Sequence, residues 1–256
     1  MLTNNELKYY SSLLQKKFRQ KEKKFIAEGL KIVEEGLASK FRCELIFITH
    51  NFADSDPEII TYLSKRKIRI ELVKEEQFRK FTETESPQGI AAVFSFKENS
   101  QAEEKILNEK LVVYLDNISD PGNLGTIIRT ADWFGVNLIL LSTGCVELYN
   151  PKVIRSTMGS IFHPDIIEDF EIHRLKKLSA KFKIILTDTF GDNLYEFSFP
   201  EKIILVFSNE AKGPSPAIQE IADGRITIPK LGKAESLNVA NAFAVVLSQF
   251  TLNTKS

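Results

Sequence analysis

The sequence predicts an α/β protein in two parts, with a small N-terminal domain and a larger domain built on a mostly parallel sheet. Short apolar runs of strand length alternate with amphipathic segments of helical period over nearly the whole chain. A polar stretch without strong periodicity separates two such series at residues 97–109. We therefore expect domains at 1–97 and 110–256, joined by a linker at 98–109.

The composition is that of a globular protein, with 43% hydrophobic residues, 27% charged residues and no net charge over 256 residues. No apolar run is long enough to span a membrane, and the start of the sequence lacks a signal-peptide core. The two cysteines, Cys43 and Cys145, suggest a reducing, cytoplasmic location rather than a disulfide framework. Their spacing from the three histidines fits no metal site, so we expect no metal.

The first 97 residues predict a self-sufficient small α/β unit. Residues 4–40 are expected to form two helices, because Leu7, Leu14 and Phe18 share one face and Phe25 to Leu37 supply another. Beyond them we expect strands at 43–48, 68–72 and 89–96 and helices at 54–64 and 74–81.

A basic segment lies between the two expected helices, in the part of the chain that carries a modest excess of positive charge. Its candidate residues are Lys16, Lys17, Arg19, Lys23 and Lys24. Clustered cations of this kind contact nucleic-acid phosphates. A solvated surface turn is the alternative for any single lysine.

The second half repeats strand, turn and helix. Strands are expected at 111–115, 137–142, 183–187, 202–207 and 225–228, and helices at 123–134, 150–158, 173–181, 214–222 and 236–252. Short apolar strands separated by helices imply a parallel sheet covered on both faces. Ligands bind such sheets beyond the carboxyl ends of the strands.

Polar clusters follow three of these strands. In the first, Asn123 occupies an expected helix N-cap, and Arg129 lies four residues after Gly125 on the same side of the helix. The second spans 208–215. The third spans 229–238, where Ser236 can cap a helix whose free N–H groups suit an anion.

The helix expected after the third cluster is apolar nearly all round at 239–247, so it must be buried on more than one side. A homodimer interface would supply the second cover. An ordinary packed C-terminal helix is the alternative.

The three clusters closely resemble the three motifs of the SpoU (TrmH-like) RNA ribose methyltransferases of the SPOUT superfamily. The matching segments are 123–131, 208–213 and 228–240, in order and each after a strand. The N-terminal unit is similar to the family's substrate-binding domain, which resembles ribosomal-protein-L30-like RNA binders, through 25–29 and 87–90.

The resemblance implies a trefoil knot in the C-terminal domain, a homodimer, and methylation of a ribose 2′-hydroxyl in ribosomal or transfer RNA. It implies S-adenosylmethionine as methyl donor. The donor site would be lined by Ser208, Ile228 and Leu237, with Leu231 and Gly232 nearby.

The catalytic residues that the resemblance implies are Arg129, Asn123, Glu210, Ser236 and Asn238. Because a guanidinium stays protonated, we expect Arg129 to stabilise the developing alkoxide while an RNA phosphate or water accepts the proton. Glu210 and Asn123 would orient Arg129 or the ribose, and Ser236 and Asn238 would shape the pocket.

Arg155 lies in a stretch, 150–160, that also resembles the RNA side of the family. A phosphate contact and a structural helix charge are equally good interpretations of it.

Two positions depart from the family pattern, because Ser208 and Ala211 replace glycines of the second motif. A serine at a positive φ would be strained, which bears on cofactor affinity. A catalytically weak RNA-binding protein of this fold is therefore an alternative, as is base methylation. A nucleotide-dependent dehydrogenase lacks its glycine-rich fingerprint here.

Overall fold

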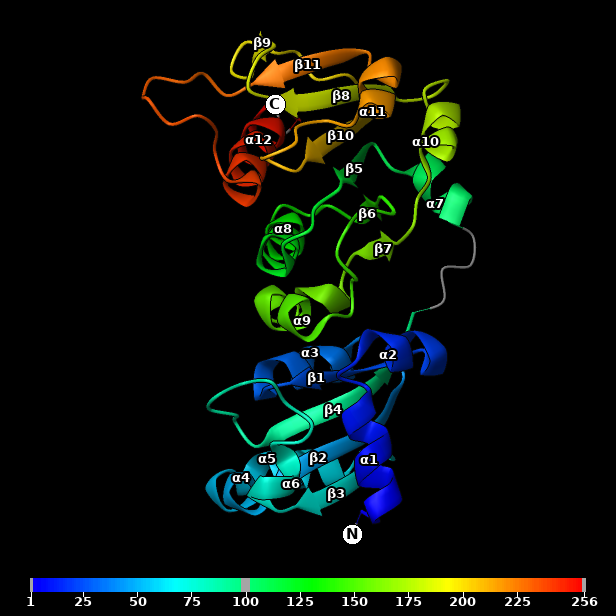
Figure 1. Cartoon of the computed structure of the whole chain (residues 1–256), viewed down its shortest axis with the longest axis vertical. Coiled ribbons are helices and arrows are strands. Elements are labelled where there is room, and N and C mark those ends of the chain that lie inside the picture. Colours follow the sequence, from blue (N-terminus) through cyan, green and yellow to red (C-terminus); the bar gives the residue numbers. More distant parts are fainter. Residues whose placement is uncertain (1, 98–101, 255–256) are drawn as a thin grey trace. The chain divides into compact units, whose positions relative to one another are not determined.

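The computed structural model describes residues 2–97 and 102–254 and contains two compact units (Figure 1). Unit 1 comprises Met1–Glu98 with Tyr149–Phe162, and unit 2 comprises Asn99–Leu148 with His163–Ser256. Part of the expected linker, 98–101, lies outside the described residues. Most of the rest forms helix α7 (Ala102–Asn108), which the polar sequence did not predict.

Unit 1 is built on a four-stranded mixed sheet in the order β1-β4-β2-β3. The strands are β1 (Lys24–Glu28), β4 (Ile90–Ser95), β2 (Cys43–Thr49) and β3 (Arg69–Val73). Only the β2–β3 pairing is parallel. The helices of this unit before β4 are α1 (Asn4–Ser12), α2 (Lys16–Glu22), α3 (Leu30–Ala38), α4 (His50–Ser55), α5 (Pro57–Ser64) and α6 (Glu75–Phe78).

The segment that joins unit 1 from later in the chain carries α9 (Pro151–Thr157) and the 3-10 turn η1 (Ser160–Phe162). Its aromatic side chains complete the packing of one face of the sheet. The ring of Tyr149 stacks 4.5 Å from Phe25, and the ring of Phe162 lies 5.0 Å from Phe94. Burial of this aromatic surface holds the segment to unit 1.

Two predictions for unit 1 were wrong in detail. Phe25 and Ile26 lie in β1 rather than on a helix, and β1 pairs antiparallel with β4. An apolar run this short fits a strand and a helix equally well by periodicity alone. The single helix expected at 54–64 is two, because Asp56 adopts an extended φ of −137° immediately before Pro57.

Unit 2 is built on a seven-stranded sheet in the order β7-β6-β5-β10-β8-β11-β9, and every pairing is parallel. The strands are β5 (Leu111–Asp116), β6 (Leu138–Leu141), β7 (Asp165–Ile167), β8 (Lys183–Asp188), β9 (Asp192–Asn193), β10 (Ile203–Ser208) and β11 (Gly224–Thr227). The α/β class and the parallel sheet are confirmed. The edge strands β7 and β9 are too short to stand out in the sequence.

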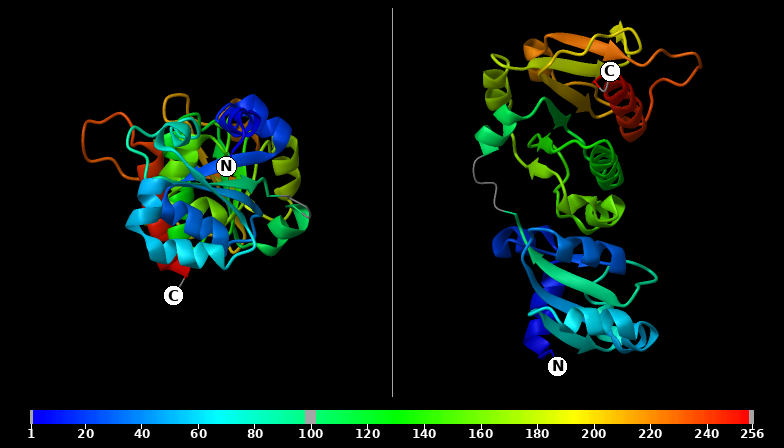
Figure 2. Two further views of the ribbon diagram at one scale, coloured as in Figure 1. Left: turned by 90° about the horizontal axis from the view of Figure 1, so that it is seen from below. Right: turned by 180° about the vertical axis from the view of Figure 1, so that it is seen from behind.

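Helices cover both faces of this sheet (Figures 1 and 2). Helices α8 (Pro121–Trp133) and α12 (Val239–Thr254) pack together on one face, where the ring of Phe243 lies 4.7 Å from Phe207. Helices α7, α10 (Ile172–Leu178) and α11 (Pro216–Ile221) cover the other, where they bury alternate residues of the central strands. Both faces of the central strands are therefore apolar.

Two helix starts differ from those expected. Helix α8 begins at Pro121, and the Asp120 side chain caps it by accepting from the Asn123 N–H. Helix α12 begins at Val239, and Asn238, not Ser236, accepts the Ala240 N–H at 2.9 Å. In both cases an Asx side chain nearer the first turn does the capping.

Cys43 and Cys145 are free thiols. Burial raises the pKa of the Cys43 thiol to about 12 and raises the pKa of Cys145 as well, so both stay protonated near neutral pH. Within residues 2–97 and 102–254, no helix is both long and apolar enough to cross a membrane.

Candidate active site

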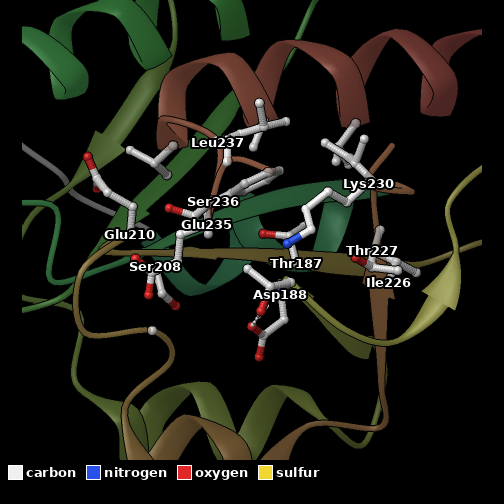
Figure 3. Close-up of a pocket in the computed structure, with 18 of the residues that line it drawn as sticks. Thr187, Asp188, Ser208, Glu210, Ile226, Thr227, Lys230, Glu235, Ser236 and Leu237 are labelled. Carbon is white, nitrogen blue, oxygen red and sulfur yellow. Dashed lines mark hydrogen bonds between the residues drawn. The ribbon is translucent and has the colours of Figure 1, made fainter. Parts of the chain in front are cut away.

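A cavity of about 340 Å³ lies at the carboxyl ends of β8, β10 and β11, in unit 2. Its walls come from residues 187–189, 207–210, 213–214, 226–232 and 234–237 and from the first half of α12. Figure 3 shows the side chains between α12 and the strand ends, with Glu210 and Ser208 toward one end and Ile226 and Thr227 toward the other. The volume is in the range of a small-molecule site.

The five residues expected to bind a cofactor all line this cavity. They are Ser208, Ile228, Leu231, Gly232 and Leu237. They come from two loops, after β10 and after β11, which the parallel sheet brings to the same edge. The structure thus brings together what the sequence separates by some twenty residues.

Ser208 closes β10 and is only 9% exposed, yet its Oγ has no hydrogen-bond partner among the described residues. A buried hydroxyl without a hydrogen-bond partner destabilises the fold, so we expect a bound ligand to supply the partner. Its φ is not in the positive region, so the serine causes no backbone strain. The concern raised by its departure from glycine therefore does not apply.

Three of the predicted catalytic residues form a hydrogen-bonded chain at the edge of the cavity. The Asn123 Nδ2 donates to Glu210 Oε1 at 3.1 Å, and the Asn238 Nδ2 donates to Asn123 Oδ1 at 2.9 Å. Asn123 thus links the first turn of α8 to the loops after β10 and β11. Glu210 lines the cavity, as does Ser236.

Arg129 is not part of this group within one chain. It is exposed on α8 and does not line the cavity. Six residues after Asn123, its side chain is turned by about 120° from the direction of Asn123 and lies about 9 Å farther along the helix. Within one chain Arg129 therefore does not join Glu210 and Asn238 at the cavity, and its expected catalytic role stays a prediction.

The carboxyl end of β8 also lines the cavity, through Thr187 and Asp188 of the strand and Thr189 after it, and the sequence reasoning missed these residues. The Asp188 carboxylate accepts a 2.7 Å hydrogen bond from Arg225 Nη1, which offsets its charge. The sequence could have indicated these residues, because they are polar and lie at the carboxyl end of a predicted strand.

The buried carboxylate of Asp116 fastens the second-motif loop from below. Asp116 ends β5 and is 2% exposed. Its Oδ2 accepts the backbone N–H of Ser215 at 2.8 Å, and its Oδ1 accepts the Asn117 Nδ2 at 2.8 Å. This position also escaped the sequence reasoning, because an Asp at the end of a strand is not distinctive by itself.

Asn209 adds further hydrogen bonds between the loop after β10 and the segment after β5, which includes Asn117. Asn209 donates its backbone N–H to Asp116 O at 3.1 Å and its Nδ2 to Asn117 O at 3.4 Å and Ser119 Oγ at 3.3 Å. Asn117 adopts a left-handed φ of 59°, and a Cβ on Gly144 would meet its Oδ1 at 1.7 Å. The geometry thus requires a glycine beside this asparagine.

The predicted RNA-contacting lysines and arginine divide into exposed and internal residues. Lys16, Lys17 and Lys23 are exposed on and after α2. Arg19 is a correction, because it is 2% exposed and its Nη1 donates to the backbone oxygens of Leu13 and Leu14. Lys24 is half-buried in β1.

The prediction that Lys24 contacts RNA from a loop is also wrong. Lys24 lies in β1, and its ammonium pairs with the Glu44 carboxylate at 2.7 Å. Arg155 lies in α9 of unit 1, where it borders a small hollow with Glu28 and Thr82. Among the described residues, no group of three or more His, Cys, Asp and Glu side chains could hold a metal ion.

Comparison with known proteins identifies the family of the chain. Residues 110–248 match the model of the SpoU rRNA methylase family. The chain belongs to the SpoU rRNA methylase family. Residues 4–92 match the MRM3-like substrate binding domain, so the N-terminal part is the substrate-binding domain of a SpoU methylase. These matches confirm the resemblance found in the sequence.

Individual SpoU relatives match over nearly the whole chain. The 23S rRNA (guanosine(2553)-2′-O)-methyltransferase of Bacillus subtilis is 34% identical, over 95% of each chain. A putative RNA methyltransferase of the TrmH family from Porphyromonas gingivalis has a TM-score of 0.87 at 31% identity, with all of both chains covered. An AdoMet-bound rRNA methyltransferase from Sinorhizobium meliloti has a TM-score of 0.82 at 26% identity, covering 97% of this chain and 95% of that one.

Replacing Asp116 tests the fastening of the second-motif loop. Asp116→Ala should lower the free energy of unfolding by about 2–3 kcal/mol, because two partly buried donors lose their buried acceptor. Chemical denaturation measures this. Ser215→Ala is the control, since it keeps the backbone N–H and removes a buried hydroxyl without a partner among the described residues. Equal stability of the two variants would contradict the assignment.

Proposed function

We propose that this protein transfers a methyl group from S-adenosylmethionine to a ribose 2′-hydroxyl of ribosomal RNA. The observation that carries the proposal is the cavity walled by the second and third motifs, with Ser208 lining it and the Asn123–Glu210–Asn238 chain bringing the first motif to its edge. Its relatives include rRNA 2′-O-methyltransferases by name. Unit 1 would bind the RNA, and the two free thiols fit a cytoplasmic location.

The cavity fits S-adenosylmethionine by size and by chemistry. Its walls are largely apolar, with Phe207, Ile226 and Val246 among them, which suits an adenosine. The buried Ser208 hydroxyl has no hydrogen-bond partner among the described residues, so it can bond a polar group of the ligand. When bound, S-adenosylmethionine would supply an electrophilic methyl group on its sulfonium.

The remaining chemistry belongs to the side chains at the edge of the cavity. Glu210, oriented by Asn123, would hold the acceptor ribose, while Asn238 fixes Asn123 in turn. Ser236 lines the cavity beside them. The 2′-hydroxyl proton would pass to an RNA phosphate or water, because a guanidinium remains protonated.

Arg129 would stabilise the developing alkoxide in the cavity of a second copy of the chain. Its exposure on α8, away from its own cavity, supports this arrangement. A homodimer is further supported by exposed leucines in the loop before α12, where Leu231 is 100% and Leu237 48% exposed, and in α12 itself, where Leu252 is 66% exposed.

The trefoil knot implied by the family is part of the proposal. Two features support it. The loops after β10 and β11 wall one cavity, and α12 then returns to pack on β10 and α8.

Mixing two inactive variants tests the shared site. Arg129→Ala and Glu210→Ala should each lose about 10²–10³-fold in methyl transfer to ribosomal RNA. Co-refolded together, they should regain about a quarter of wild-type activity, because half the dimers are mixed and each mixed dimer has one complete site. Each variant refolded with itself is the control.

The mixture can also fail. If mixed dimers form, as shown by differently tagged copies, and activity stays absent, then Arg129 serves its own chain. If Arg129→Ala turns over like wild type, Arg129 has no role in catalysis.

Ser208→Ala tests the cofactor site by binding alone. The variant should bind S-adenosylmethionine about fivefold to tenfold more weakly by calorimetry, because a buried hydrogen bond is lost. Ser215→Ala is the matched control, since its hydroxyl is also buried without a partner among the described residues but does not line the cavity. Unchanged affinity in Ser208→Ala would refute the assignment.

The catalytically weak RNA-binding protein is the second candidate, because Ser208 and Ala211 replace glycines of the second motif, although neither residue has a positive φ. Wild-type protein that binds RNA but produces no heat with S-adenosylmethionine would favour it. Base methylation would appear as a methyl group on a nucleobase in the same transfer assay.

A further inference from the structure

The outer face of α8 carries a stripe of exposed side chains. Leu124, Ile127, Ile128 and Ala131 are buried on the inner face, against the rest of unit 2. Thr126, Arg129 and Trp133 are exposed. Their spacings of three, four and seven residues place them one above another on the helix.

Trp133 is the only tryptophan of the chain and is 84% exposed. Within the described residues its ring contacts no other aromatic ring and no cation. A large aromatic side chain left in water loses the favourable burial it would gain against a partner. Its exposure therefore points to a ligand.

The surroundings of Trp133 are polar. Its neighbour Asp132 pairs with His163 Nδ1 at 2.8 Å, and Thr126 and Arg129 share its stripe. The other large exposed apolar residues described in unit 2 belong to the loops after β8 and β9, the third-motif loop and α12. Because protein interfaces are built around a contiguous apolar centre, a lone ring beside a cation suits a nucleobase better than a second protein surface.

We propose that Trp133 stacks on a base of the RNA substrate, next to the nucleotide whose ribose Arg129 contacts. Single-stranded RNA is recognised by stacking on aromatic rings, with cations on the neighbouring phosphates. Side chains four residues apart on a helix have Cβ atoms about 5–6 Å apart, so one short RNA segment can contact both. The inference rests on the proposed function and assigns a substrate contact that the three motifs do not include.

The single tryptophan makes the wild-type protein its own reporter. Titration with deproteinised ribosomal RNA should change the tryptophan fluorescence saturably, and dilution of the free protein should not. A spectrum that changes on dilution but not with RNA would show that a second copy covers Trp133. An unchanged spectrum while filter binding shows the RNA bound would equally overturn the proposal.

Variants give an independent measurement. Trp133→Ala should raise the KM for RNA roughly tenfold to a hundredfold, the effect of losing one base stack, with a smaller change in kcat. Trp133→Phe should recover most of the loss, and the affinity for S-adenosylmethionine should be unchanged in both. Tyr195→Ala is the control, because Tyr195 is 56% exposed but lies in the loop after β9.

The two proposals fail separately. If the wild-type protein transfers no methyl group, the proposed function falls, while RNA affinity of Trp133→Ala by filter binding still tests the stack. If Trp133→Ala keeps wild-type KM, RNA affinity and turnover, the stack is refuted and the methyltransferase stands.

Discussion

The side chain of Asn123 joins the first turn of α8 to two loops that are far from it in the sequence. Its amide nitrogen holds Glu210 after β10, and its amide oxygen holds Asn238 before α12. An asparagine suits this position because one planar group both donates and accepts. Without it, the Glu210 carboxylate and the start of α12 would have no common partner at the edge of the cavity.

The parallel sheet makes this convergence possible. Its central strands all end on one edge, so the residues that follow β5, β8, β10 and β11 become neighbours. Asp116 then fastens the β10 loop to β5 by accepting the Ser215 N–H inside the protein. Two sets of hydrogen bonds thus hold the loops around the cavity. One is made by the buried Asp116 carboxylate, and the other is the chain of Asn238, Asn123 and Glu210 at the edge of the cavity.

Much of the site could be predicted from the sequence, because polar clusters after apolar strands are visible without a structure. The resemblance of these clusters to the family motifs then named the five cofactor candidates, and all five line one cavity. The catalytic role of Arg129 stays a prediction, because a motif gives the spacing of residues but not the cavity that each side chain faces. Arg19 was misjudged because a basic cluster does not show which member turns inward to cap the backbone oxygens of Leu13 and Leu14.

Long-range packing also limited the fold prediction. The segment Tyr149–Phe162 joins unit 1 through aromatic contacts to Phe25 and Phe94, which no local pattern encodes. Ser208 shows the opposite case. Its departure from the family glycine was visible in the sequence, but only the structure shows that its hydroxyl is buried without a partner among the described residues and that its backbone is relaxed.

The central claim is that this cavity methylates a ribose of ribosomal RNA. Nucleoside mass spectrometry of ribosomal RNA, from cells with and without the gene, tests it most directly. We expect one 2′-O-methylnucleoside to disappear with the gene and to return with the wild-type gene but not with a copy encoding Glu210→Ala. An unchanged set of ribose methylations, or the loss of a base methylation instead, would contradict the account.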